Sequence, residues 1–226
     1  DDNFASIVNA IEEGRAVFEN IRKFLAYILT SNVPELIPYL AYVLLRIPLP
    51  LTIIQILAVD LGTDMLPALA LGAEKPHPGV MRRPPRRPQE RLLAWPLLAR
   101  SYLWLGMLQA AAAMAAYFAV LQAGGWAWGE ALAKADPLYL EATTACLAAI
   151  VVAQVVNAFL CRHPEEPAVR FRPSDNPLLL AGIAFELVLI LAIVYTPAGN
   201  ALFRTRPLGA GTWLAMTALA LGIGLL

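Results

Sequence analysis

A long apolar stretch, residues 24–71, carries acidic side chains where a lipid bilayer would exclude them. A turn at residues 46–50 divides it into two arms, and each arm is long enough to cross a bilayer, which takes about 20 apolar residues. Glu35 lies in the first arm, and Asp60 and Asp64 lie in the second. A charge at membrane depth costs several kcal/mol, so such carboxylates usually face a cavity and mark an ion path.

The backbone around these acids is loosened by prolines and a glycine. Pro34, Pro38 and Pro67 lack the N–H that would bond the carbonyl four residues earlier in a helix. Gly62 separates the two acids of the second arm and lets the backbone leave helical geometry without a Cβ penalty. We therefore expect the second span to be unwound, with its distortion at residues 61–63. Irregular backbone at membrane depth lines a protein-enclosed cavity, and its free carbonyls coordinate cations.

Polar side chains recur every four residues in both arms, which places them on one side of each helix. They are Tyr27, Ser31 and Glu35 in the first arm, with Asn32 beside them, and Asp60 and Asp64 in the second, with Thr63 adjacent. If the two stripes face each other, they supply an all-oxygen site, which suits hard cations such as Na⁺, K⁺ or Ca²⁺ and does not suit transition metals. The alternative is a proline-kinked pair of helices whose polar groups bond one another.

These motifs resemble a known family. Residues 30–35 read Thr-Ser-Asn-Val-Pro-Glu and residues 60–64 read Asp-Leu-Gly-Thr-Asp, which is similar to the fifth and sixth membrane helices of P-type cation-transporting ATPases. Residues 1–4 and 12–15 resemble the junction where that family's phosphorylation domain meets its stalk helix. The resemblance covers essentially the whole chain and implies the fifth to tenth membrane helices of a cation pump. It is nearest the sodium-pump and bacterial group, with some calcium-pump features.

The resemblance also implies roles for individual residues. The cation ligands it implies are Ser31, Asn32, Glu35, Asp60, Thr63 and Asp64, with Tyr27 lining the site. Gln154 and Glu186 match positions that complete an additional site in the sodium pump, although polar groups that only join packed helices are the alternative. Asn157 replaces an aspartate of the sodium pump and resembles the calcium pumps, so the transported monovalent or divalent cation stays open.

The composition agrees with an integral membrane protein. Of the 226 residues, 59% are hydrophobic, which is too apolar for an ordinary soluble domain, and the formal net charge of zero gives no reason to expect nucleic acid as a partner. We expect an all-α bundle of six membrane spans in a lipid bilayer. The expected spans lie near residues 24–45, 51–71, 102–121, 142–160, 177–195 and 210–226.

The chain divides into four expected parts. These are a cytoplasmic stalk helix at 1–23, an ion-site hairpin at 24–71, a cytoplasmic basic loop at 72–101 and a four-helix support region at 102–226. Only four of the 17 Lys and Arg residues, Arg46, Lys134, Arg204 and Arg206, fall in the expected outer loops. The positive-inside rule then places both termini in the cytoplasm, and we expect a plasma or inner membrane.

The chain carries no catalytic motif of its own. It has neither the Asp-Lys-Thr-Gly-Thr phosphorylation motif nor a Gly-x-x-x-x-Gly-Lys phosphate loop, so we expect no catalytic or nucleotide-binding residues in it. We read it as a fragment that works with an N-terminal portion holding four more membrane helices and the cytoplasmic domains that bind ATP and Mg²⁺. The alternative function is a secondary cation transporter or channel subunit, against which the absence of an inverted repeat counts.

Overall fold

The computed structural model describes residues 4–77, 79–82, 84–85, 91–162 and 175–225. Within these residues every regular element is a helix, so the expected all-α fold is confirmed. The elements are α1 (Phe4–Leu45), α2 (Ile53–Leu57), η1 (Ala58–Thr63), α3 (Met65–Gly72), η2 (Val80–Arg82), α4 (Trp95–Leu98), η3 (Ala99–Gly106), α5 (Met107–Ala123), α6 (Pro137–Arg162), α7 (Pro177–Tyr195), α8 (Pro197–Phe203) and α9 (Ala210–Leu225). Expected cytoplasmic residues Asp1, Asp2, Asn3, Arg83, Arg86, Arg87, Arg170 and Arg172 lie outside the described residues.

Five helical segments are long and apolar enough to cross a membrane. They are Phe4–Leu45, Ile53–Gly72, Trp95–Ala123, Pro137–Arg162 and Pro177–Tyr195. The sixth expected span is α9, an apolar helix of 16 residues. At 1.5 Å per residue it is about 24 Å long, somewhat less than the roughly 30 Å of a hydrocarbon core. The chain is therefore an integral membrane protein with five spans established by length and composition.

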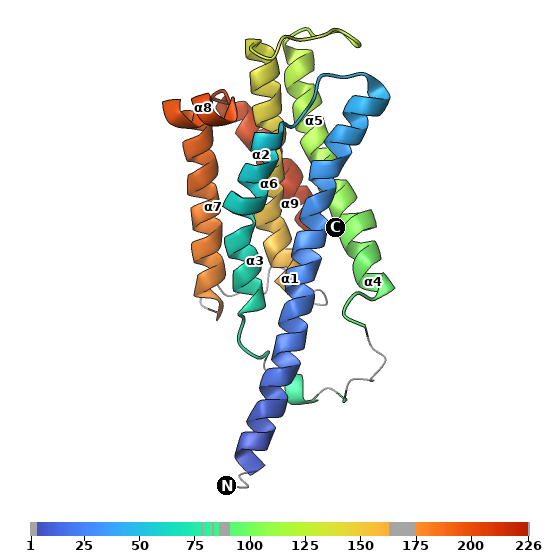
Figure 1. Cartoon of the computed structure of the whole chain (residues 1–226), viewed down its shortest axis with the longest axis vertical. Coiled ribbons are helices and arrows are strands. Elements are labelled where there is room, and N and C mark those ends of the chain that lie inside the picture. Colours follow the sequence, from blue (N-terminus) through green and yellow to red (C-terminus); the bar gives the residue numbers. More distant parts are fainter. Residues whose placement is uncertain (1–3, 78, 83, 86–90, 163–174, 226) are drawn as a thin grey trace.

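The first helix, α1, runs without a break through Pro34 and Pro38. Its N-terminal part extends beyond the helical bundle at the lower end of the molecule (Figure 1). Apolar side chains are exposed in this N-terminal part of α1; Phe4 is 82% exposed and Val17 is 54% exposed. One helix therefore joins the described part of the expected stalk, residues 4–23, to the first span.

The second span is distorted where the sequence predicted, but it is not unwound. Ala58–Thr63 forms a π-helix between α2 and α3, and the Asp64 N–H donates to the carbonyl of Val59 at 2.9 Å, five residues back. A π-helical turn holds one extra residue and keeps its backbone bonds. The distortion therefore widens the helix, and the carbonyl of Thr63 still lacks the N–H that Pro67 cannot supply.

The third span differs from the prediction at its start. Helix begins at Trp95, before the expected residue 102, and Ala99–Gly106 forms a second π-helix. This distortion lies against α1, since a Cβ placed on Gly106 would come within 2.7 Å of the Val33 Cβ. The contact joins η3 to α1, two segments far apart in the sequence, so local sequence patterns do not predict it.

The expected outer loop at 196–209 contains a short helix, α8. Thr196 caps it by accepting a hydrogen bond from the Gly199 N–H at 3.0 Å, and Pro197 occupies its first position. The helix ends at Arg204, which adopts a left-handed conformation with φ of 53°. Figure 1 shows α8 lying across the upper end of α7.

Helix α6 lies at the centre of the bundle and packs against α1, α5, α7 and α9. Its buried surface is rich in small side chains, among them Ala142, Ala145, Ala148 and Ala149. Small residues let membrane helices approach closely. This close packing fixes α6 and α7 beside the first two spans, where the polar residues of the chain gather.

Candidate cation-binding site

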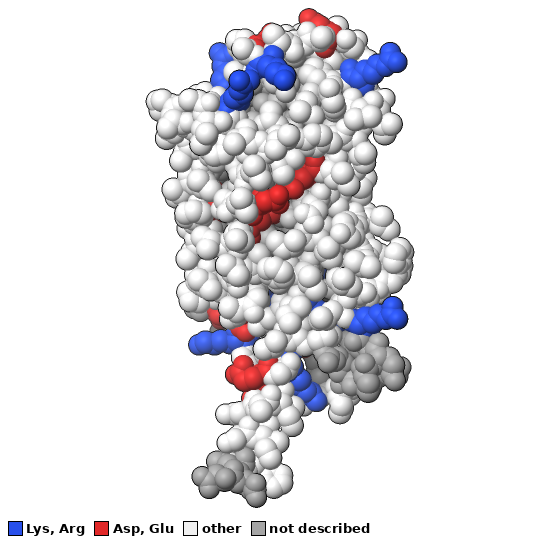
Figure 2. All heavy atoms as spheres, viewed as in Figure 1, with Lys and Arg blue, Asp and Glu red and all other residues white. Residues whose placement is uncertain are grey.

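Four acidic side chains lie in the middle parts of the membrane spans. Glu35, Asp64 and Glu186 are 8%, 1% and 0% exposed, whereas Asp60 is exposed. Figure 2 shows acidic atoms half-way along an otherwise uncharged surface, with the Lys and Arg atoms of this face near the two ends of the molecule. Carboxylates in such a position are costly unless they serve a site.

The acids of the first two spans lie close to one another. Glu35 on α1 and Asp60 on η1 are within hydrogen-bonding reach of each other. Asp64, at the junction of η1 and α3, accepts hydrogen bonds at Oδ1 from the Tyr27 hydroxyl at 3.4 Å and from Thr63 Oγ1 at 3.5 Å. Ser31 also lies within reach of the Asp64 side chain. The predicted facing of the two stripes is therefore present.

A second polar group continues the row on α6 and α7. Glu186 lies within electrostatic range of both Asp64 and Tyr27. Gln154 accepts a hydrogen bond at Oε1 from Asn157 Nδ2 at 2.9 Å, and the same Asn157 nitrogen reaches the carbonyl of Tyr27 at 3.5 Å. Gln154, Asn157 and Glu186 are all fully buried.

Several buried oxygens of this row have no hydrogen-bond partner among the described residues. They are Glu35 Oε1, Asp64 Oδ2 and both carboxylate oxygens of Glu186. The amide nitrogen Gln154 Nε2 is unpartnered as well. Buried polar atoms are nearly always paired, because an unpaired one costs roughly 1–3 kcal/mol. Unpartnered carboxylate oxygens are what a bound cation would satisfy.

The acids form a row of neighbours and not a compact cage. In the part of the chain that the structure describes, no group of three or more His, Cys, Asp and Glu side chains lies close enough to hold one metal ion. Any cation held here would take one or two carboxylates together with hydroxyl, amide and carbonyl oxygens. That ligand mixture suits hard cations.

The other predicted ligands differ in their exposure. Thr63 and Ser31 are each 1% exposed, and the Ser31 hydroxyl donates to the carbonyl of Ile28 at 3.0 Å. Asn32, like Asp60, is exposed on the outer surface of the described bundle. Two of the predicted ligands thus lie on an open face of the membrane-spanning part.

Sequence reasoning missed two buried polar features. Gln109 on α5 is fully buried and neither atom of its amide has a hydrogen-bond partner among the described residues. It stands alone in an alanine-rich span, so no spacing singled it out. Glu74, just after α3, falls in the expected basic loop at 72–101 and was not singled out, but it is 9% exposed and paired with Lys23 and Arg162.

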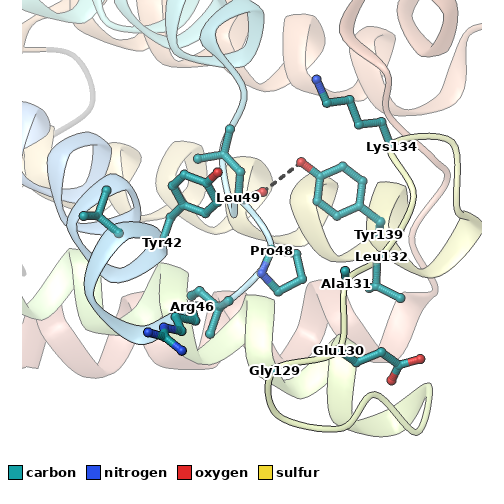
Figure 3. A pocket seen from close by; sticks show the side chains of 12 residues that line it. Tyr42, Arg46, Pro48, Leu49, Gly129, Glu130, Ala131, Leu132, Lys134 and Tyr139 are labelled. Carbon is teal, nitrogen blue, oxygen red and sulfur yellow. Dashed lines mark hydrogen bonds between the residues drawn. The ribbon is translucent and has the colours of Figure 1, made fainter.

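A separate cavity of about 680 Å³ lies at the end of the bundle opposite Glu74. It is between the connection from α1 to α2 and the connection from α5 to α6 (Figure 3). Arg46, Lys134 and Tyr139 are among its lining residues, and the Tyr139 hydroxyl donates to the carbonyl of Leu49 at 3.0 Å. None of the predicted cation ligands lines it.

Comparison with known proteins agrees with this geometry. The family described as "Cation transporting ATPase, C-terminus" matches residues 48–226. The chain is 36% identical to a sodium/potassium-transporting ATPase alpha subunit of Drosophila melanogaster over 99% of its own length and 24% of that protein. It is 34% identical to the alpha-4 subunit of Rattus norvegicus and 35% identical to the alpha subunit of Hydra vulgaris, over 94% and 95% of its length.

The chain spans about a quarter of the length of these curated relatives. The matched region includes η1, α3 and every later helix, and therefore most of the site described above. The chain belongs to the family of cation-transporting ATPase C-terminal regions.

Proposed function

We propose that this chain is the membrane transport region of an ATP-driven cation pump and supplies part of the binding site for the transported ion. The proposed ligands are Ser31, Asn32, Glu35, Asp60, Thr63 and Asp64, with Tyr27, Gln154, Asn157 and Glu186 completing the polar row. The transported cation is the substrate, of the Na⁺, K⁺ or Ca²⁺ class.

The observation that carries this proposal is the set of buried, unpartnered carboxylate oxygens on Glu35, Asp64 and Glu186. A structural polar cluster would pair these atoms, because leaving them unpaired destabilises the fold. A site that binds and releases an ion instead needs oxygens that are free when the ion has left. The second span supports the same reading, because Asp64 beside its π-helix at Ala58–Thr63 contacts Tyr27 of α1 and Pro67 supplies no N–H for the Thr63 carbonyl.

The proposal includes partners beyond this chain. ATP and Mg²⁺ would act through cytoplasmic domains, and further membrane helices would cover the face on which Asn32 and Asp60 are exposed. The curated relatives are about four times as long, which supports such partners. We further propose that both ends of the chain face the cytoplasm of a plasma or inner membrane, because most Lys and Arg residues fall on that side.

Cation binding by the full-length protein tests the proposal. Na⁺, K⁺ and Ca²⁺ are titrated separately while ATP-dependent phosphorylation is measured, first on the unaltered protein and then on Asp64→Asn and Gln154→Ala. Asp64→Asn keeps the shape of the side chain and removes its charge, so it should lower the affinity for the activating cation by about 30-fold or more. Gln154→Ala should lower this affinity by less than about tenfold. An unchanged cation dependence in Asp64→Asn would mean that the acid is structural and the ion site lies elsewhere.

A further inference from the structure

Glu74 joins four helices at the end of the bundle from which the N-terminal part of α1 extends. The residue follows the last turn of α3, and its side chain is 5% exposed. Lys23 of α1 places its ammonium 2.6 Å from Glu74 Oε2, and the guanidinium of Arg162, in the last turn of α6, pairs with Glu74 Oε1. One carboxylate therefore binds two cations from two different helices.

Two asparagines complete the cluster. Asn20 of α1 donates from Nδ2 to the backbone carbonyl of Glu74 at 2.5 Å. Asn176 caps α7 by accepting from the Leu179 N–H at 2.9 Å, and its Nδ2 donates to the carbonyl of Ala70 at 3.2 Å and reaches Glu74 Oε1 at 3.5 Å. Both asparagines are 5% exposed. The cluster is thus buried and charged, and hydrogen bonds join its members.

The four joined helices are those that carry the polar row. Lys23 precedes Glu35 on α1 by about three helical turns, and Glu74 follows Asp64 by about the same distance. Arg162 follows Asn157 on α6 by one to two turns, and Asn176 begins the helix that holds Glu186. Figure 1 shows the lower end of α3 between those of α1 and α7, and α3 packs against both.

We infer that Glu74 is a positioning residue for the cation site, which sets the relative places of α1, α3, α6 and α7 through its pairs with Lys23 and Arg162. This inference rests on the proposed function. A displacement of α1 along its axis by one residue would move the Lys23 backbone by about 1.5 Å, so the Lys23 side chain would have to rearrange to keep its 2.6 Å ion pair. The pair therefore opposes a shift of α1 against α3.

The burial of the cluster makes it sensitive to each charge. A buried ion pair adds little net stability over an apolar pair, but removing one partner leaves an uncompensated charge in a poorly solvated place. Glu74→Gln leaves the cations of Lys23 and Arg162 facing a neutral amide. Lys23→Gln removes one of the two cations that pair with Glu74 and leaves Arg162 and the Asn176 amide. Both changes loosen α1 from α3 without touching any proposed ligand.

The test measures ATP-dependent phosphorylation of the full-length protein against the concentration of whichever of Na⁺, K⁺ and Ca²⁺ activates it. Glu74→Gln and Lys23→Gln should each raise the half-activating concentration by about tenfold, in the range of substitutions that alter coupling without contacting a ligand. The double variant should equal Glu74→Gln alone, because Glu74→Gln already removes the pair with Lys23. Lys23→Arg, which keeps the charge, should restore most of the affinity, and Glu13→Gln on the exposed stalk should change nothing.

The possible outcomes separate the two proposals. A purely structural role would lower the yield and thermal stability of Glu74→Gln while the folded fraction keeps its cation dependence, and that result would overturn the inference. If Asp64→Asn shifts the cation dependence and neither Glu74→Gln nor Lys23→Gln does, the inference fails while the proposed function stands. If Asp64→Asn shifts nothing, the proposed function fails. Should Glu74→Gln not fold, Lys23→Gln against Lys23→Arg decides the inference alone.

Discussion

The hydroxyl of Tyr27 on α1 donates a hydrogen bond to Oδ1 of Asp64 at the start of α3, at 3.4 Å. Both side chains are buried, at 0% and 1% exposure, and Tyr27 also lies within electrostatic range of Glu186 on α7. Tyr27 therefore lies between Asp64 and the polar residues of α6 and α7, among them Asn157 and Glu186. It orients Asp64 so that Oδ2 has no hydrogen-bond partner among the described residues.

Tyr27→Phe removes this donor and keeps the ring. Asp64 Oδ1 then keeps Thr63 Oγ1 as a donor at 3.5 Å, so the carboxylate becomes less well oriented but does not lose its charge. A hydrogen bond of this length contributes about 0.5–1.5 kcal/mol at most, which corresponds to a loss of cation affinity of no more than about tenfold. A cation titration of the phosphorylation reaction checks this. A loss as large as that of Asp64→Asn would show that Tyr27 itself is a ligand.

Gly106→Ala should destabilise the packing of the end of η3, where α5 begins, on α1. The added methyl would lie 2.5 Å from Val33 Cγ2 and 2.7 Å from Val33 Cβ, closer than carbon atoms tolerate. Overpacking of this kind costs about 1–3 kcal/mol. The measurement is the temperature at which the purified protein loses its monodisperse state in detergent.

Gly72→Ala is the matched control, because nothing lies within 4 Å of a Cβ placed on this helical glycine. It should be neutral or stabilise the protein by up to about 1 kcal/mol, since alanine favours the helix. Equal melting temperatures for the two variants would mean that α1 and α5 can separate without cost.

Local signals were sufficient to predict most helix ends. The fifth span was predicted at 177–195, the bounds of α7, because Asn176 and Pro177 mark its start and Thr196 and Pro197 follow its end. The pairing of Tyr27 with Asp64 was also predictable, since side chains spaced four residues apart share one face of a helix. The ends of α7 depend only on residues close together in the sequence, and the Tyr27–Asp64 pairing, across 37 residues, followed from the periodicity of each arm.

Features that depend on distant residues were not predictable. Glu74 reads as one acid in a proline-rich loop, and its partners Lys23 and Arg162 lie 51 and 88 residues away in the chain. The π-helix at Ala99–Gly106 likewise lies where α1 approaches α5. The sequence also gave no reason to expect that Asn32 and Asp60 would be exposed while their neighbours Ser31 and Thr63 are buried.

The orientation of the chain in the membrane is testable by cysteine labelling. Glu13 on the stalk and Lys134 in the connection between α5 and α6 are both exposed, and three spans separate them. In sealed vesicles of one orientation, a membrane-impermeant maleimide should label Lys134→Cys of the full-length protein from the outside and Glu13→Cys only after permeabilisation. The native Cys146 and Cys161 are fully buried and should stay unlabelled. Labelling of both positions from one side would contradict the proposed topology.

Pro67→Ala tests whether the free carbonyl of Thr63 contributes to cation binding. The alanine restores an N–H that can bond this carbonyl, which favours a regular α-helix over the π-helical turn at Ala58–Thr63. We expect the helix to become more stable and the cation affinity to fall by about three- to tenfold, the loss expected for one neutral oxygen ligand. Pro197→Ala is the control, because the first position of α8 needs no N–H. A cation titration of both full-length variants makes the comparison, and equal affinities would exclude the Thr63 carbonyl as a ligand.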